Sequence, residues 1–454
     1  MKMKKIKNRK QQRFNYQYEM IDEICEQFGL THQDIIKAVK ALRPLVTQVQ
    51  KNGEPKAVSQ NVIHQLQDLQ ERRVIYDKIL KNAKENQSLK KLNLRSLQKY
   101  LVDYCGEKKL RDGSIYRPWL YALVTLTQNY SMNKVHLISP TRTIPTFYHQ
   151  LHLGEAQAGK SFNTADILVG SEKDGIPPHG IPFVYHSFDG ASPAAFVQNL
   201  YVLEQASDYG HVYINEEVSD WTAKKDVINN IKKVLERKKV TWQLKTKLSI
   251  PSFVTKGNFI MTANERYSGE TSLNDENSDL NALMSRCITV GWKFTDEISD
   301  FNIERTLKIN PRMAKNIRQF MVLLHNITHN NQFNVTMTKK QFSEIVNLRK
   351  SYIKKMKSRQ DINSENVVFV KTGIRDILNV CKFAANLALM NYFHQGKKTE
   401  LKIDNLEMKF AKMLLIDIMD SREKELEAQS TTSKMSRRMV SNILTDTEID
   451  NNVG

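Results

Sequence analysis

One segment of the chain has the residue types and the spacing of a phosphate-binding loop. Residues 154–161 read Gly-Glu-Ala-Gln-Ala-Gly-Lys-Ser and fit the pattern G-x-x-x-x-G-K-[ST]. Glycines let backbone N–H groups surround phosphates, and a following helix N-terminus adds positive potential. We expect Lys160 to reach the β- and γ-phosphates of ATP and the Ser161 hydroxyl to join the shell of Mg²⁺. The predicted nucleotide-binding residues are Gly154, Glu155, Ala156, Gln157, Ala158, Gly159, Lys160, Ser161 and Phe162.

Residues 211–214 (His-Val-Tyr-Ile) form an apolar segment that ends in Asn215, Glu216 and Glu217. At such a strand end one side chain usually holds the magnesium shell and the next polarises water, in the order Asp then Glu. Asn215 stands at the Asp position, and its amide oxygen can accept from a metal-bound water but brings no charge. Either Glu216 is the base and Asn215 a weakened metal partner, which we favour, or Glu216 and Glu217 form the pair. The expected metal shell is therefore Ser161, Asn215 and Glu216.

Two further polar residues stand beside predicted strands. Asn264 follows the apolar segment 258–263, where an amide can orient the attacking water or touch the γ-phosphate. Arg286 precedes the apolar segment 287–292. A guanidinium there could reach the nucleotide of a neighbouring subunit, because it stabilises charge that is spread over phosphoryl oxygens. The order and spacing of these motifs predict a nucleotide hydrolase.

The elements that must position these residues change in type along the chain. Between residues 116 and 300, short apolar segments alternate with helical patterns, which predicts a parallel α/β sheet. The regions before and after this part show helical periodicity. The expected domains are a basic flexible arm (1–15), a helical N-terminal domain (16–115), an α/β core (116–300), a helical lid (301–420) and a flexible tail (421–454).

Together, the motifs resemble those of the AAA+ ATPases, and in particular the branch that holds the minichromosome maintenance (MCM) helicases and the MoxR-type ATPases. The resemblance covers about residues 147–420. It implies an α/β P-loop AAA+ core, here with an all-helical N-terminal domain and a helical C-terminal lid. Residues 231–269 are similar to the helix, β-hairpin and sensor strand of that branch. The resemblance suggests Asn264 as the first sensor, Arg286 as the arginine finger and Arg375 as the second sensor.

The chain departs from the family at several points. Asn215 replaces the usual acid. Only 16 residues separate Phe196 from Tyr213, which is too few for the additional hairpin that MCM and MoxR proteins insert there. The helical N-terminal region does not resemble the MCM N-terminal domain with its oligonucleotide-binding barrel. Residues 21–42 have the rhythm of a helix-turn-helix, although an ordinary helical hairpin explains the same pattern and is preferred.

The formal net charge of +19 lies in two segments. Residues 1–110 carry 23 Lys and Arg against 12 Asp and Glu, and residues 224–256 carry ten against two. Such excess favours a polyanionic partner. By the resemblance, the second segment points into the pore of a ring, with Lys245 and Lys247 near the hairpin tip and Trp242 beside them, which suits a DNA backbone. The remaining cations are expected to be a solvated helix face: Lys232, Lys233, Arg237, Lys238 and Lys239.

The expected function is that of an ATP-dependent DNA helicase or translocase that acts in replication. It would form a ring, expected to be a hexamer, on single-stranded or forked DNA. The alternatives are a MoxR-like protein-remodelling ATPase and a nucleotide-switched initiator or DNA-binding scaffold.

A hydrophobic fraction of 40% is enough for a large core, and four scattered cysteines without a CxxC pair argue against a disulfide scaffold. Since no apolar run approaches the length of a membrane span, we expect a cytoplasmic protein.

Overall fold

The computed structural model describes residues 56–128, 134–154, 158–173, 175–186, 193–207, 209–216, 218, 225–243, 249–263, 283–292, 295–304, 309–357 and 373–421. The chain divides into two compact units. The larger one comprises residues 76–190, 210–236 and 256–454, and the smaller one the rest. The basic arm, the segment 21–42 and the tail after residue 421 lie outside the described residues.

The centre of the larger unit is a five-stranded sheet of β5 (His149–Gly154), β6 (Val184–His186), β7 (Val212–Asn215), β10 (Asn258–Ala263) and β11 (Cys287–Trp292). The strands stand in the order β11-β5-β10-β7-β6, and every neighbouring pair is parallel. All residues of β7 and β10 are buried, as expected of strands that are covered on both faces. The predicted parallel α/β sheet is therefore confirmed.

Strand β5 carries polar side chains that are buried and paired inside the protein. The backbone N–H of Phe259 donates to His149 Nδ1 over 3.0 Å, and His149 Nε2 lies 3.1 Å from the Leu235 carbonyl oxygen. The Thr125 hydroxyl donates to Gln150 Oε1 over 3.2 Å. Buried polar side chains are tolerated where such partners exist.

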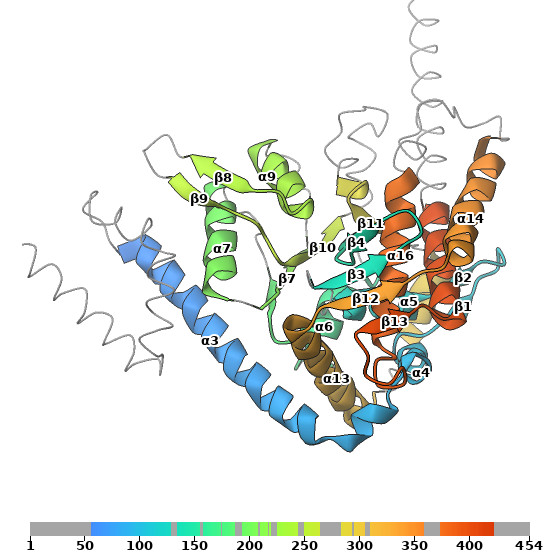
Figure 1. Cartoon of the computed structure of the whole chain (residues 1–454), viewed down its shortest axis with the longest axis horizontal. Coiled ribbons are helices and arrows are strands. Elements are labelled where there is room, and N and C mark those ends of the chain that lie inside the picture. Colours follow the sequence, from blue (N-terminus) through green and yellow to red (C-terminus); the bar gives the residue numbers. More distant parts are fainter. Residues whose placement is uncertain are drawn as a thin grey trace, which may run out of the picture. The chain divides into compact units, whose positions relative to one another are not determined.

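A second sheet of four strands also belongs to the larger unit, and Figure 1 labels all four. It has the order β13-β12-β3-β4, formed by β13 (Glu400–Lys402), β12 (Phe333–Thr336), β3 (Val135–Ile138) and β4 (Thr143–Pro145). Strand β12 pairs with β13 and β3 in parallel, whereas β3 and β4 are antiparallel. The expectation of an entirely helical region after residue 300 is wrong at β12 and β13.

Helices make up most of the remaining larger unit. Every residue of α5 (Pro118–Thr127) is buried, and this helix packs against α4, α6 and α16. The other described elements are η1 (Gln87–Lys91), α4 (Leu94–Cys105), β1 (Lys108–Lys109), β2 (Ile115–Tyr116), η3 (Phe162–Asp166), α6 (Ile167–Val169), α9 (Lys225–Leu235), α12 (Asp296–Glu304), α13 (Pro311–Asn330), α14 (Lys339–Lys357), α16 (Gly373–Leu389) and a helix at 405–421.

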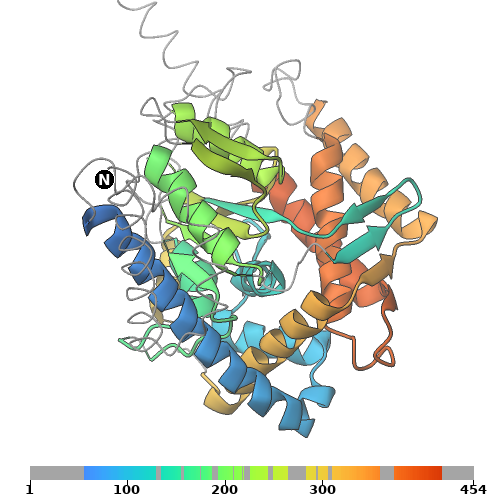
Figure 2. The ribbon, with the colours of Figure 1, turned by 60° about the vertical axis from the view of Figure 1, so that its left-hand side comes forward.

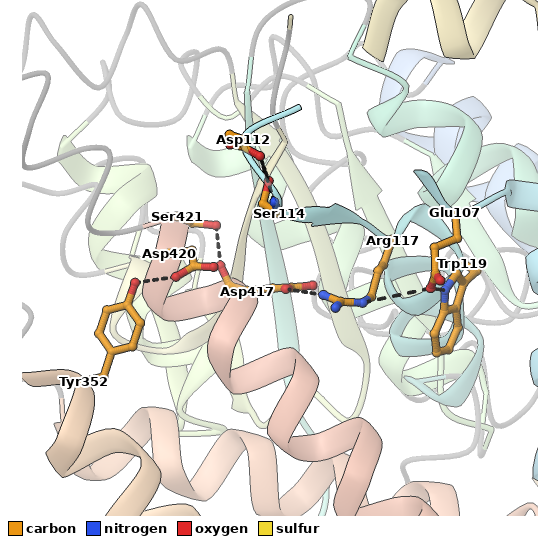
Figure 3. A network of polar contacts seen from close by, with 9 residues as sticks. All are labelled: Glu107, Asp112, Ser114, Arg117, Trp119, Tyr352, Asp417, Asp420 and Ser421. Atoms are coloured by element: carbon orange, nitrogen blue, oxygen red, sulfur yellow. Dashed lines mark hydrogen bonds and ion pairs between the residues drawn. The ribbon is translucent and has the colours of Figure 1, made fainter. Parts of the chain in front are cut away.

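A polar network joins the beginning and the end of the larger unit (Figure 3). Arg117 Nη1 lies 3.2 Å from Asp417 Oδ1, and Arg117 Nε lies 4.0 Å from Glu107 Oε2. Trp119 Nε1 donates to the same Glu107 oxygen over 2.7 Å. The Arg117 and Asp417 side chains are only 16% and 9% exposed, so this pair is largely withdrawn from water. It fastens the final helix to the segment before α5.

The smaller unit holds α7 (Pro193–Ala206), the antiparallel pair β8 (Val240–Gln243) and β9 (Ser249–Phe253), and the part of α3 (Lys56–Glu85) up to Ile75. Both strands pack against α7, and Figure 2 shows the yellow-green ribbon beside this green helix. In chain order, α9 is followed by β8, β9 and β10, which agrees with the predicted order of helix, hairpin and strand.

Within this unit, Arg237 differs from the expected surface cation. Its guanidinium nitrogens Nε and Nη1 are buried, and burial lowers the pKa of Arg237 to about 9, against the opposing effect of the Glu204 carboxylate. Glu204 lies on α7 and is 3% exposed. The prediction of a solvated side chain is therefore wrong for Arg237, whereas Lys233, Lys238 and Lys239 are exposed as expected.

Candidate functional site

The predicted phosphate loop begins where β5 ends, at the carboxyl edge of the central sheet. Gly154 is the last residue of β5 and pairs with Trp292 of β11. A Cβ atom at Gly154 would lie 2.8 Å from both the Cβ and the carbonyl oxygen of Trp292, so only glycine fits. Gly159 has a φ of +85°, a backbone conformation that L-residues with side chains rarely adopt. Both motif glycines therefore have a structural reason.

The side chain of Lys160 folds back over this loop. Its Nζ donates a hydrogen bond to the Gly154 carbonyl oxygen, which places a positive charge between the end of β5 and the start of the next helix. Asn163 Nδ2 donates to the Gly159 carbonyl oxygen over 2.9 Å, and the Thr164 hydroxyl donates to the Lys160 carbonyl oxygen over 2.8 Å. Lys160 is half-buried and Ser161 is exposed, which leaves the Ser161 hydroxyl open to a ligand.

Elements from before the central sheet support the loop. The Tyr116 hydroxyl donates to the Ala158 carbonyl oxygen over 3.4 Å. The ring of Tyr104, at the end of α4, stacks on Phe162 with 5.3 Å between the centroids. The sequence pattern missed Tyr104 and Tyr116, because nothing in their local sequence links them to a loop about 50 residues away. Glu155, Ala156 and Gln157 lie outside the described residues.

His152 also supports the loop from within β5. Trp292 Nε1 donates to His152 Nδ1 over 3.0 Å, and His152 Nε2 lies 3.0 Å from Gln150 Oε1. Burial, with a smaller contribution from the nearby Lys160 charge, lowers the pKa of His152 to about 3. The ring is therefore neutral at physiological pH, and it links β11 to β5 directly below Gly154.

The predicted acidic strand end lies at the same edge of the sheet. Asn215 is the last residue of β7 and is 1% exposed, whereas Glu216 is exposed. Strand β10 holds this segment, because the Thr262 hydroxyl donates to the Glu216 carbonyl oxygen and the Val218 N–H donates to the Thr262 carbonyl oxygen over 2.9 Å. Glu217 lies outside the described residues.

The distance between these two parts follows from the sheet. Strand β10 is hydrogen-bonded to β5 on one side and to β7 on the other. Since neighbouring strands are about 4.8 Å apart, β5 and β7 are roughly 10 Å apart across β10. Asn215 is level with Leu151, three residues before Gly154, so the ends of the two strands are roughly 14 Å apart. That separation leaves room for phosphates and a hydrated magnesium ion between Lys160 and Glu216. Asn264 follows the last residue of β10 in sequence and lies outside the described residues.

Arg286 lies at the opposite edge of the sheet. It immediately precedes Cys287, which pairs with His149 at the start of β5, whereas Gly154 at the end of β5 pairs with Trp292. The five residue steps from Cys287 to Trp292 span about 17 Å at 3.3 Å per residue. Arg286 Nη2 forms an ion pair with Glu236 Oε1 at 2.6 Å. The structure therefore does not bring Arg286 together with Lys160 of the same chain.

Arg375 lies beside Arg286 and not beside the phosphate loop. Its Nη2 is 3.8 Å from the same Glu236 oxygen, and its Nη1 donates to the Ser285 hydroxyl over 3.0 Å. Glu236 and Ser285 were missed by the sequence pattern. Of the remaining predicted residues, Trp242 lies in β8 of the smaller unit, and Lys245 and Lys247 lie outside the described residues.

Other kinds of site receive no support from the described part of the chain. There, no group of three or more His, Cys, Asp or Glu side chains is arranged to hold a metal ion, so a divalent ion would depend on the nucleotide phosphates as well. The thiols of Cys105, Cys287 and Cys381 are buried. No helix in the described ranges is long and apolar enough to cross a membrane.

No protein-family model matches this chain, and no curated protein sequence matches it either.

Proposed function

We propose that this protein is an AAA+ ATPase that acts as an ATP-dependent DNA helicase or translocase. The observation that carries the proposal is the geometry of the phosphate loop. Lys160 folds over a loop between Gly154 and Gly159, at the sheet edge where Asn215 and Glu216 end a strand two positions away. This arrangement fits a nucleotide with its metal ion, because it offers a glycine-lined cradle, one ammonium group and an exposed carboxylate.

Each residue has a separate task in this proposal. Magnesium bound with ATP would offset the negative charge of the phosphates. Lys160 would hold the outer phosphates, the Ser161 hydroxyl would face the metal, and Glu216 would accept a proton from water. Asn264 directly follows β10, the strand that lies between β5 and β7. This place in the sequence supports a sensor role for Asn264, because β10 separates the phosphate loop from the end of β7.

The position of Arg286 favours an oligomer. At about 17 Å along the strand from the edge that carries the phosphate loop, the guanidinium can serve a nucleotide only if that nucleotide belongs to another subunit. Arg375 shares this edge. A ring, which we propose to be a hexamer, would bring the Arg286 edge of one subunit to the phosphate loop of the next.

DNA is the proposed substrate because one of the two cationic segments of the chain contains the β8–β9 hairpin. The segment 224–256 has a net charge of +8, and Lys245 and Lys247 belong to the stretch between the two strands. Lysines beside an aromatic residue suit a single strand that is bound without sequence preference.

The test is strand displacement on forked DNA together with ATP hydrolysis. We expect Lys160→Ala to reduce hydrolysis about 100-fold or more, because no other charge replaces the ammonium group. The exposed Lys173→Ala is the matched control. Replacing Lys245 and Lys247 together by alanine should abolish strand displacement and DNA-stimulated hydrolysis, whereas the exposed pair Lys238 and Lys239, replaced in the same way, should keep both. Hydrolysis that is indifferent to DNA would favour a protein-remodelling ATPase.

A second candidate function rests on Asn215. An amide at 1% exposure occupies the place where a carboxylate usually supports the metal shell. Slow turnover would suit a replication initiator that assembles on DNA when ATP is bound. This function predicts ATP-dependent assembly on DNA with little phosphate release.

A further inference from the structure

Two arginines from distant parts of the sequence meet on one carboxylate. Glu236 Oε1 lies 2.6 Å from Arg286 Nη2 and 3.8 Å from Arg375 Nη2. The Ser285 hydroxyl lies 3.0 Å from Arg375 Nη1 and 3.5 Å from Arg286 Nη1. The Arg286 and Glu236 side chains are 19% and 20% exposed, so their contact is partly shielded from water. Such charge-assisted contacts are short and directional.

The local structure gives no reason for these charges at these positions. Glu236 directly follows α9, and its N–H donates to the Lys232 carbonyl oxygen, so its carboxylate sits at the negative end of the helix dipole. Arg375 is in the first turn of α16, which is the positive end of that helix. A carboxylate at a helix C-terminus and a cation at a helix N-terminus are both unfavourable. Their attraction to each other and to Arg286 offsets this.

We propose that Glu236 is a positioning residue that gathers Arg286 and Arg375 into one paired-guanidinium site for the phosphates of a nucleotide bound to a neighbouring copy. The inference rests on the proposed function. It adds Glu236 to the proposed site and gives a reason why Arg286 and Arg375 lie together. Two guanidinium groups repel each other when they are close, and one carboxylate between them leaves a net charge of one. A guanidinium carries five N–H donors, so Arg286 can keep Glu236 and still offer other donors to phosphate oxygens.

Glu236→Gln is the direct test. It keeps the shape and a hydrogen-bond acceptor but removes the charge that holds the arginines together. We expect kcat for ATP in the assembled oligomer to fall about 10-fold, with KM changed less than about 3-fold, because the arginines act mainly on charge that develops during the reaction. Glu236→Asp keeps the charge and should recover part of the loss. Glu400→Gln is the matched control, since the exposed Glu400 bonds only to the neutral Asn334 amide in the contacts described.

A double-mutant cycle separates positioning from simple support of the fold. Arg375→Ala should lower kcat in the wild-type background and lower it much less in the Glu236→Gln background, because Arg375 then already lacks its partner. Additive effects would overturn the proposal, as would an unchanged kcat in Glu236→Gln with a lowered melting temperature. The melting temperatures of all variants are measured to exclude unfolded protein.

Two further measurements distinguish failure of this inference from failure of the proposed function. Mixed oligomers of Lys160→Ala and Arg286→Ala subunits should regain activity if the arginine acts on a neighbour's nucleotide. If wild-type protein hydrolyses no ATP, the proposed function fails. The side-chain signals of ¹⁵N-arginine, assigned by substitution, then test the pairing alone. Hindered rotation of the Arg286 guanidinium that persists in Glu236→Gln would overturn the positioning role, and its loss would support it.

Discussion

Asn215 is the residue at which the site departs most from the chemistry that its surroundings suggest. It ends β7 with 1% of its surface exposed, beside β10 and at the edge that carries the phosphate loop. A neutral amide can remain buried there whether or not a metal ion is bound. A carboxylate at the same place would be buried without compensation unless a cation came close. If a metal ion binds here, the choice between Asn and Asp would balance stability without nucleotide against metal affinity.

We predict that Asn215→Asp makes the stability of the protein depend on magnesium and nucleotide. Without them, the free energy of unfolding should fall by about 1–3 kcal/mol, because the new carboxylate is buried. With Mg²⁺ and ATP, most of this loss should be recovered and ATP hydrolysis should rise. Melting curves with and without Mg²⁺ and nucleotide measure the first effect, and phosphate release the second. A variant whose melting temperature is lowered equally under both conditions would show that Asn215 does not face the metal.

The position of the predicted phosphate loop, at the end of a strand, could be inferred from the sequence because the motif is local. The residues from Gly154 to Ser161 are contiguous, and their types are dictated by phosphate itself. The residues that support the site could not be predicted in this way. Tyr104, Tyr116 and Trp292 reach it through packing of distant elements, and each is an ordinary residue type in its own segment.

At the scale of elements, β10 connects the two halves of the site. Its register places Ala263 beside Leu153 of β5 and Met261 beside Asn215 of β7. Thr262 lies between Met261 and Ala263. Its hydroxyl donates to the Glu216 carbonyl oxygen, and its carbonyl oxygen accepts from the Val218 N–H. The phosphate loop and the segment after β7 could therefore move relative to each other only if β10 moved as well.

We predict that Thr262→Val loosens the segment after β7 without changing the packing of β10. Valine has nearly the same shape but lacks the hydroxyl, so the Glu216 carbonyl oxygen loses one donor and the free energy of unfolding should fall by about 1 kcal/mol. Hydrolysis should fall more than nucleotide affinity, because Lys160 and the glycines are untouched. Thr289→Val on β11 removes a similarly buried hydroxyl away from this segment and is the matched control. Equal effects of the two variants on kcat would contradict the connecting role of β10.

The second sheet marks the limit of element prediction. Strands β12 and β13 have four and three residues and lie among long helices, so their alternating burial is too short to stand out from helical periodicity. Strand β3 precedes the central sheet by a short segment, yet it pairs with β12 nearly 200 residues later in the chain. Pairing over that distance leaves no trace in a local pattern. The apolar strands β7, β10 and β11, whose residues are nearly all buried, were by contrast predicted close to their observed bounds.

At the scale of the whole larger unit, several histidines are buried in neutral form at places where distant segments meet. His152 joins β5 to β11, and the Tyr100 hydroxyl lies 2.7 Å from His179 Nε2. The Tyr76 hydroxyl lies 2.9 Å from His325 Nδ1, which connects α3 to α13. Burial lowers the pKa of His179 to about 4 and, helped by the neighbouring His329 and His211, that of His325 to about 3.

These pKa values predict that the larger unit loses stability in mild acid. In the unfolded chain a histidine takes up a proton near pH 6.5, whereas His152, His179 and His325 remain neutral in the folded protein until about pH 3 to 4. Between these values the unfolded state binds more protons, so the free energy of unfolding must fall as the pH falls. Each histidine contributes up to about 1.4 kcal/mol per pH unit to that slope.

Urea unfolding at pH 7, 6, 5.5 and 5 measures this slope. His325→Gln should be less stable at pH 7, because the contact with Tyr76 changes, but its slope below pH 6.5 should be shallower than that of the wild type by up to about 1.4 kcal/mol per pH unit. His394→Gln, at an exposed position, controls for the loss of an imidazole as such. If His325→Gln loses stability with the wild-type slope, the imidazole of His325 already carries a proton in the folded protein at pH 5, and the contacts of α13 with α3 would have to accommodate a charge.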